Sequence, residues 1–156
     1  MQNKIQIKTM FWDQTDLSYQ ILIEILANDI QFGIEKEHIR FDYIVGVPRG
    51  GLIPAVSLSH ILDIQMININ DEAIYSSNVL FVDDVCHSGA TFFKLEKNFN
   101  NQNLTHKYVS VVKNELTTHD LWKYAMEAKE NEWVIFPWEM PLTKIEMREK
   151  IRKHIK

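Results

Sequence analysis

The sequence predicts an α/β fold in which a central, mostly parallel sheet is flanked by helices. Short apolar runs that suit buried strands alternate with segments of helical periodicity, and this alternation is typical of a parallel sheet. Three of the five glycines stand in two loops that each join such a strand to a helix. Because ligands bind beyond the carboxyl ends of the strands in sheets of this kind, both loops are expected at one rim.

Length and composition predict a single domain over residues 1–156. The chain is 46% hydrophobic and 24% charged, which excludes a disordered chain, and about 100 to 200 residues suffice for one core. No stretch of 18 residues lacks a charge, and the N-terminus has no long apolar leader. We therefore expect no membrane segment and a cytoplasmic protein. The single cysteine, Cys86, fits a reducing compartment.

The first expected element is a helix over residues 16–30, with Asp13 or Thr15 available as its N-cap. Apolar residues recur there at helical spacing. The residues expected to face the core are Leu17, Ile21, Leu22, Ile25 and Leu26.

Strands and helices then alternate along the chain. The expected strands are residues 43–47, 64–69, 79–82, 107–112 and 122–126. The expected helices are residues 52–62 and 90–99. Residues 141–156 carry six basic side chains and only two acidic ones, and we interpret them as a solvated amphipathic helix, with binding to nucleic acid or to an anionic membrane as the alternative.

Both glycine-containing loops have the composition of phosphate sites. Gly50 and Gly51 follow the strand at 43–47, and Gly89 precedes the helix at 90–99. Glycine lets backbone N–H groups approach an oxyanion, and a following helix N-terminus adds a favourable dipole. Neither the dinucleotide fingerprint nor the P-loop is present. Tight turns without a ligand are the alternative interpretation of each loop.

The second loop has two different halves. Asp83 and Asp84 end an apolar run, and carboxylates accept hydrogen bonds from a sugar diol or bind a hard cation such as Mg²⁺. Ser88 and Thr91 follow, whose hydroxyls suit a terminal phosphate together with nearby amides. This order of groups indicates a phosphorylated sugar as ligand.

Three segments resemble one known family. Residues 82–91 resemble the 5-phosphoribosyl-1-pyrophosphate (PRPP) motif of the type I phosphoribosyltransferases. Residues 44–54 are similar to the pyrophosphate loop of its xanthine–guanine and archaeal purine branch, and residues 133–139 to the segment at its base-binding hood. The resemblance implies the Rossmann-like fold of that family, with a small hood at about residues 127–140.

The resemblance also implies a role for each matched residue. Those implied to bind PRPP are Arg49, Gly50, Gly51, Asp83, Asp84, Ser88, Gly89, Ala90 and Thr91. Arg49 and the Gly50 and Gly51 amides would hold the pyrophosphate. The two aspartates would hold the ribose hydroxyls and Mg²⁺, and the remaining four residues would bind the 5-phosphate.

Three further residues are implied to bind the base. Lys113 would contact the 6-oxo group of a purine, Trp133 would stack on the ring, and the Val134 backbone would face its 2-position. Taken alone, Lys113 fits a solvated lysine at a strand end, and Trp133 fits core packing.

The chain departs from the family pattern at two places. His87 stands where purine members have an aspartate near N7 of the base, and a neutral imidazole can also accept the proton there. Only residues 70–78 are available where family enzymes have a long loop that closes over PRPP. A missing lid is expected to slow transfer or permit PRPP hydrolysis, unless another segment or a neighbouring subunit excludes water.

The resemblance implies a pentosyltransferase of purine salvage that transfers the phosphoribosyl group of PRPP to N9 of a 6-oxopurine and releases pyrophosphate. His87, Asp84 and Arg49 are the expected catalytic residues, and Mg²⁺ is the expected cofactor. The expected partners are PRPP, a purine base and further copies of the chain, with no nucleic acid or membrane. A PRPP- or nucleotide-binding regulatory protein is the alternative, and transfer to another nucleobase or a small amine is a third hypothesis.

Overall fold

The computed structural model describes residues 5–12, 17–139 and 149. Contacts divide the chain into two compact units, one within residues 1–21 and 130–156 and the other over residues 22–129. The predicted single domain stays a prediction, and the helix predicted over 141–156 lies outside the described residues apart from Glu149. None of the described helices combines the length and apolar composition that a membrane span requires.

The larger unit is built on a parallel five-stranded sheet, which confirms the predicted fold class. Its strand order is β3-β2-β4-β5-β6, and every neighbouring pair is parallel. The strands are β2 (Tyr43–Gly46), β3 (Met66–Ile67), β4 (Val79–Cys86), β5 (His106–Asn114) and β6 (Lys123–Ala128).

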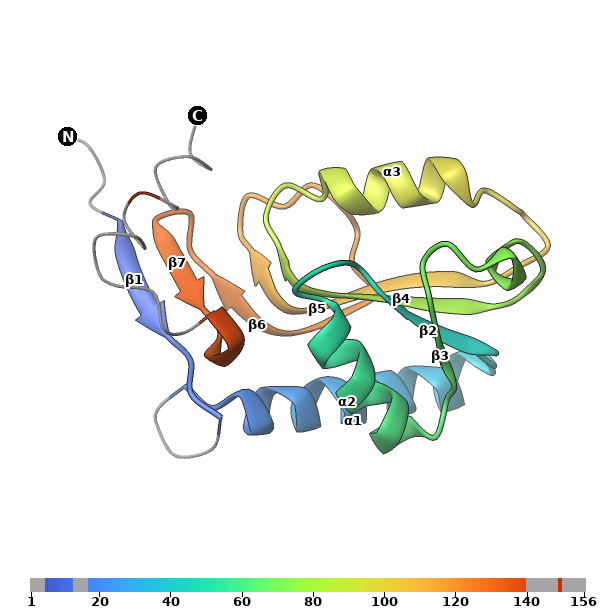
Figure 1. Ribbon diagram of the computed structural model, residues 1–156, viewed down its shortest axis with the longest axis horizontal. Helices are drawn as coiled ribbons and strands as arrows, with labels where there is room; N and C mark the ends of the chain where they lie inside the picture. The colour runs from blue at the N-terminus through green and yellow to red at the C-terminus, as the bar shows by residue number, and fades with distance from the viewer. Residues whose placement is uncertain (1–4, 13–16, 140–148, 150–156) are drawn as a thin grey trace. The chain divides into compact units, whose positions relative to one another are not determined.

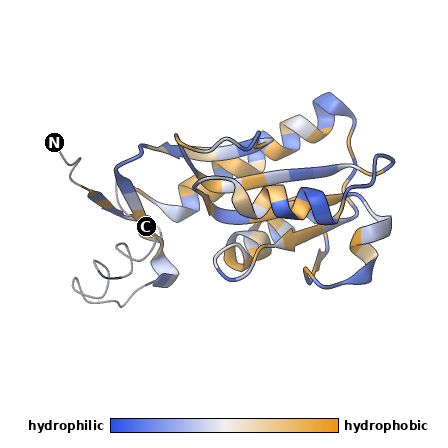
Figure 2. Ribbon diagram, turned by 90° about the horizontal axis from the view of Figure 1, so that it is seen from above, coloured by the Kyte–Doolittle hydropathy of each residue, from blue (hydrophilic) through white to orange (hydrophobic). Residues whose placement is uncertain are grey.

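Helices cover both faces of this sheet. In Figure 1, α3 (Ala90–Asn98) lies above the sheet, and α1 (Tyr19–Glu37) and α2 (Leu52–Leu62) lie below it. Figure 2 shows hydrophobic and hydrophilic residues side by side on these helices, as expected for elements with one buried face. The α2 bounds agree with the prediction, and α3 ends one residue earlier than predicted.

The prediction for α1 was wrong in its start, in its end, which lies at Glu37 rather than at residue 30, and in part of its buried face. The helix begins at Tyr19, where the Ser18 hydroxyl accepts a hydrogen bond from the Ile21 amide at 3.4 Å. Leu22 and Leu26 are buried as predicted, but Ile21 and Ile25 are exposed. The hydrophobic side chains buried along the helix are Tyr19, Leu22, Ile23, Leu26, Ala27 and Ile30. Two adjacent apolar stripes occur in this segment, so periodicity alone does not choose between them.

Strand β4 continues past the predicted end at Val82. It pairs with β5 as far as Cys86, which lies opposite Lys113. Asp83 and Asp84 are therefore strand residues rather than the start of a loop. By contrast, β3 is shorter than predicted because only Met66 and Ile67 pair with β2.

Residues 70–78, at the place of the expected lid, fold into a compact turn. Residues Glu72–Ser76 form the 3-10 helix η1, and the Asp71 carboxylate accepts a hydrogen bond from the Ala73 amide at 2.9 Å. Ile74 is fully buried in the core of the larger unit. The segment is thus anchored to the core by its short helix.

The smaller unit contains a separate two-stranded sheet. Strand β1 (Gln6–Thr9) pairs in parallel with β7 (Glu132–Ile135), and the Lys8 ammonium lies 2.8 Å from the buried Glu132 carboxylate. An aromatic cluster packs in the same unit. Its members are Trp12, Tyr19, Phe136 and Trp138.

Candidate functional site

The two loops predicted to bind one ligand lie against each other. We call residues 48–51 the glycine loop. A Cβ atom at position 50 would overlap the Asp84 carboxylate, and a Cβ atom at position 51 would lie only 2.9 Å from the Cα atom of Asp83. The Val47 amide donates to the Val82 carbonyl at 2.8 Å. The glycine loop therefore stands directly over the acidic end of β4.

Main-chain hydrogen bonds fix the shape of the glycine loop. The Gly51 amide donates to the Val47 carbonyl at 3.0 Å, and the Leu52 amide donates to the Arg49 carbonyl at 3.2 Å. The peptide bond between Pro48 and Arg49 is cis. In this conformation the Gly51 amide already has a partner, whereas the Arg49 side chain is exposed.

Asp83 and Asp84 turn back onto the amides that follow them. An Asp83 oxygen accepts from the Asp84 amide at 2.9 Å, and an Asp84 oxygen accepts from the Val85 amide at 2.7 Å. Burial, and after it the neighbouring Asp84 charge, raise the pKa of Asp83 to about 8. Two close carboxylates that resist joint ionisation form a donor set that suits a hard divalent cation.

The donor set therefore fits the Mg²⁺ that the sequence predicts. Asp83 and Asp84 are the residues that would hold it. Among residues 5–12, 17–139 and 149, no group of three or more His, Cys, Asp or Glu side chains is placed to hold a metal ion, so the remaining oxygen ligands would come from substrate and water, as is usual for Mg²⁺.

Residues 87–91, which we call the hydroxyl loop, enclose a small cavity with the end of β4. Its volume is about 130 Å³. Gly89 has φ of 85°, in the left-handed region that favours glycine, and it caps α3. The Ser88 hydroxyl accepts from the Ala90 amide at 3.3 Å. The lining residues are Asp83, Val85, Cys86, His87, Ser88, Gly89, Ala90, Thr91 and Phe92.

The hydroxyl loop is held by contacts with a segment that the sequence analysis did not select. We call residues 115–121 the threonine turn. The Thr117 hydroxyl donates to the Cys86 carbonyl at 2.6 Å and also contacts the His87 carbonyl. The side chain of His119 occupies the space next to Gly89, where an added Cβ would overlap it. The only sequence signal is a pair of threonines and a histidine shortly after β5.

His119 connects this support to α3. Its ring nitrogen Nε2 lies 3.0 Å from the Glu96 carboxylate, and its side chain is only 1% exposed. No sequence pattern assigns His119 to the site, because Glu96 and Gly89 are distant from it along the chain. The Cys86 thiol is buried beneath the same loop, and this burial raises its pKa, as expected for a structural rather than a reactive cysteine.

Lys113 lies within β5, not just after it as predicted. It stands opposite Cys86 in the sheet register. Its ammonium lies 3.5 Å from the Glu127 carboxylate and 5.0 Å from the centre of the Tyr124 ring. The lysine therefore has two neighbours on β6 that the sequence did not identify.

The larger unit holds the glycine loop, both aspartates, the hydroxyl loop and Lys113, whereas Trp133 and Val134 belong to the smaller unit. Both of these residues are in β7, where Trp133 pairs with Ile7 and Val134 with Lys8. The Val134 side chain is buried.

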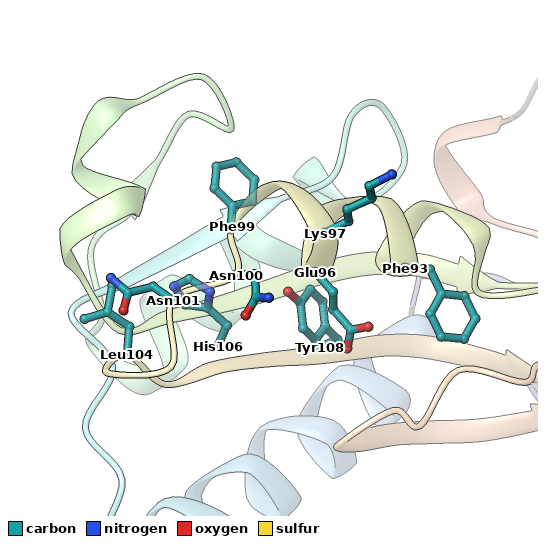
Figure 3. Close-up of a pocket in the computed structure, with 9 residues that line it drawn as sticks. All are labelled: Phe93, Glu96, Lys97, Phe99, Asn100, Asn101, Leu104, His106 and Tyr108. Carbon is teal, nitrogen blue, oxygen red and sulfur yellow. The ribbon is translucent and has the colours of Figure 1, made fainter.

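A second hollow, of about 520 Å³, follows α3 away from Gly89. Figure 3 shows its lining side chains, with Phe93 at one end and Leu104 at the other. It includes Glu96, the partner of His119. None of the residues predicted from the sequence to bind a ligand lines it.

Comparison with known proteins identifies the fold. The chain is similar to a purine phosphoribosyltransferase from Pyrococcus horikoshii, with a TM-score of 0.65, 24% identity and coverage of 88% of this chain and 98% of that one. The Helicobacter pylori xanthine-guanine-hypoxanthine phosphoribosyltransferase gives a TM-score of 0.64 with 16% identity over 96% of this chain and 100% of that one. The chain has the type I phosphoribosyltransferase fold.

Sequence comparison confirms the resemblance to the purine phosphoribosyltransferases. A curated xanthine-guanine phosphoribosyltransferase from Cereibacter sphaeroides is 24% identical over 124 residues, which are 66% of this chain and 72% of that protein. A Neisseria gonorrhoeae protein of the same fold, described with bound ppGpp, gives a TM-score of 0.64 at 16% identity over 97% of this chain and 99% of that one. No family model matches the sequence.

Proposed function

We propose that this protein is a purine phosphoribosyltransferase, which transfers the phosphoribosyl group of PRPP to N9 of a 6-oxopurine and releases pyrophosphate. The observation that carries the proposal is the contact between Gly50 and Asp84. It places the glycine loop against the acid pair, and Asp83 of that pair also lines the cavity at the hydroxyl loop. Pyrophosphate, ribose diol and 5-phosphate occur in the same order along PRPP.

On this proposal each part of the site binds one part of PRPP. The exposed Arg49 guanidinium and the Gly50 amide hold the pyrophosphate, for which a planar guanidinium is well shaped. The Gly51 amide would join them only by exchanging its bond to Val47. Asp83 and Asp84 hold the ribose hydroxyls. Mg²⁺, when bound there, supplies charge that stabilises the departing pyrophosphate.

The 5-phosphate is assigned to the cavity of about 130 Å³ at the hydroxyl loop. Ser88, Gly89, Ala90 and Thr91 line it, and the N-terminus of α3 follows directly. Amides and hydroxyls at a helix N-terminus favour a dianionic phosphate. Fixing both ends of PRPP leaves C1 of the ribose positioned for attack, which is the main catalytic contribution expected here.

Within the larger unit the base is assigned to Lys113, and the base contacts expected of Trp133 and the Val134 backbone, which belong to the smaller unit, stay predictions. We propose that Lys113 donates to the 6-oxo group, and that Glu127, 3.5 Å from its ammonium, holds the side chain in place. His87 is exposed at the start of the hydroxyl loop, and its imidazole is proposed to accept the purine proton as the glycosidic bond forms. The cytoplasmic location and homo-oligomeric state stay predictions.

The first experiment is an incubation with Mg²⁺, PRPP and a panel of purine and pyrimidine bases, followed by mass spectrometry of the products. A purine mononucleotide is the expected product, and its mass identifies which base was used. A pyrimidine product would contradict the purine assignment. Intact PRPP across the whole panel would overturn the transferase proposal and favour a nucleotide-binding protein.

Two variants test the assigned residues. Asp84→Asn removes a charge from the ribose and metal site, and Arg49→Ala removes the pyrophosphate contact, so each is expected to abolish turnover at subsaturating PRPP while the circular dichroism spectrum stays unchanged. The matched controls are Asp29→Asn and Arg40→Ala, both at exposed positions outside the site. Full activity in either site variant would contradict the roles assigned here.

A further inference from the structure

Carbonyl groups on one side of the hydroxyl loop are held by the threonine turn. The Thr117 hydroxyl donates to the Cys86 carbonyl at 2.6 Å and contacts the His87 carbonyl. The Thr118 hydroxyl donates to the Ser88 carbonyl at 3.4 Å. The carbonyl oxygens of three consecutive residues, 86 to 88, therefore face the side chains of Thr117 and Thr118.

This arrangement sets the direction of the amides on the other side. Apart from the bond between Pro48 and Arg49, the described peptide bonds are trans, and a trans peptide places its N–H opposite its carbonyl. The N–H groups of His87 and Ser88 therefore point away from Thr117. Consecutive amides that share one direction form an anion-binding concavity.

The position of the cavity agrees with this geometry. Its lining runs from Asp83 to Phe92 and includes the hydroxyl-loop residues, but no residue of the threonine turn. The turn and the cavity thus lie on different sides of the hydroxyl loop. A substrate phosphate in the cavity would meet the amide side, while Thr117 holds the carbonyl side.

The threonine turn is itself fixed by a buried asparagine. The Asn114 side chain accepts from the Leu116 amide at 3.0 Å and donates to the Lys129 carbonyl at 3.1 Å. The Asn114 carbonyl accepts from the Thr117 amide at 2.9 Å. Asn114 is only 3% exposed, so it ties the turn to the end of β5 and places the Thr117 hydroxyl in one position.

We infer that Thr117 is a positioning residue for the substrate 5-phosphate, through its hydrogen bond to the peptide carbonyls of the hydroxyl loop. The inference rests on the proposed function, because it assumes that the phosphate of PRPP occupies the cavity. It assigns Thr117 no contact with the substrate. The residue acts by keeping the loop amides directed at the phosphate before it arrives, which lowers the cost of binding.

The test compares Thr117→Val with Thr117→Ser. Valine preserves the shape of threonine without its hydroxyl, and serine preserves the hydroxyl. We expect Thr117→Val to weaken PRPP binding about tenfold in calorimetry, the loss of roughly one hydrogen bond, and to raise the KM for PRPP with little change in kcat. Thr117→Ser should restore both values. Binding of pyrophosphate with Mg²⁺ should stay unchanged in both variants, because the glycine loop is not altered.

Thr105→Val is the matched control, since it makes the same chemical change in the turn before β5, outside the site. Wild-type PRPP affinity in Thr117→Val would overturn the inference and leave the proposed function intact. An equal loss of pyrophosphate affinity in that variant would also overturn it, because the effect would then be general unfolding. If the wild-type protein binds no PRPP, the proposed function and the inference both fail. Should Thr117→Val not fold, Thr117→Ala is compared with Thr117→Ser by the same measurements.

Discussion

Position 50 requires glycine because the Asp84 carboxylate occupies the space that a side chain would need. Gly50 belongs to the glycine loop and Asp84 to strand β4, yet their contact determines how close the pyrophosphate and ribose parts of the proposed site lie. The absence of a Cβ at position 50 thus lets the glycine loop lie against a carboxylate of β4 that is 34 positions away in the sequence.

Substitution of this glycine tests the coupling. In Gly50→Ala the new methyl group overlaps Asp84, so either the carboxylate or the glycine loop must move. We expect kcat/KM for PRPP to fall about hundredfold, as displacement of a positioning group by about 1 Å can cause. Steady-state kinetics and thermal unfolding would be measured together. Wild-type kinetics would show that the contact has no role in catalysis.

At the residue scale, the sequence is sufficient to select residues whose type alone indicates a possible role in binding. Asp83, Asp84 and the loop glycines are of this kind. Thr117 and His119 could not be predicted in the same way, because their roles depend on Cys86 and Gly89, about 30 residues earlier. A hydroxyl that binds a backbone carbonyl leaves no pattern in a single sequence.

Among the elements, the C-terminal end of α1 is attached to the sheet by a polar group. The Glu37 carboxylate accepts from the Trp122 indole at 2.7 Å and from the Lys107 ammonium at 3.1 Å. These two bonds, the Trp122 bond first, lower the pKa of Glu37 below its ordinary value of 4.5. The last turn of α1 is thereby held to β5 and to the start of β6.

This attachment predicts a dependence of stability on pH. Because the folded-state pKa of Glu37 lies below the unfolded value, its contribution is fully present above pH 4.5 and is lost as the pH falls through the folded value. Glu37→Gln should therefore show a smaller decrease in unfolding free energy between pH 5 and pH 3, roughly the range below the ordinary carboxyl pKa. Urea unfolding at several pH values measures this.

Trp122→Phe should reduce the same pH dependence, because it removes the hydrogen bond that lowers the Glu37 pKa most. Identical pH profiles for wild type and Glu37→Gln would mean that the carboxylate contributes nothing in solution. That result is the expectation for an ordinary exposed ion pair.

Element types were predicted better than element ends. The α2 bounds agree with the prediction, and its N-cap Gly51 belongs to the glycine pair that is visible in the sequence. The end of β4 was wrong since two aspartates resemble a loop, whereas the paired strand β5 continues beside them to Lys113. Pairing with a partner strand, not residue type, determines where that strand stops.

At the scale of the whole molecule, the compact 70–78 segment bears on how the site excludes water. Ile74 is fully buried, and the Ser77 carbonyl lies 3.1 Å from the His106 ring. A segment anchored in this way at both η1 and its end is not free to close over PRPP as a long lid would. At the proposed site, this segment would therefore not exclude water from the ribose of PRPP.

We consequently expect the protein to hydrolyse PRPP when no base is present. The measurement is the release of ribose 5-phosphate and pyrophosphate over time, with Mg²⁺ and PRPP alone, and with Asp84→Asn as the control for catalysis by the site. Hydrolysis by the wild type that is absent in the variant is the expected result. PRPP that stays intact until a purine is added would show that water is excluded by another part of the protein.

The division of the molecule into two units was beyond prediction from one sequence. Strands β1 and β7 are parallel neighbours, but Ile7 and its partner Trp133 are separated by most of the chain. Two short strands of four residues each give weak local signals, and no turn joins them. The five-stranded sheet was predictable because its strands follow one another with helices between them.

The tryptophans are unevenly shared between the units, and this provides two separate optical probes. Trp12, Trp133 and Trp138 belong to the smaller unit, and Trp122 belongs to the larger one. Intrinsic fluorescence is therefore weighted toward the smaller unit, whereas the far-ultraviolet dichroism of α2 and α3 reports on the larger one. Denaturation curves that coincide by both signals would indicate one cooperative transition, and separated curves would indicate two.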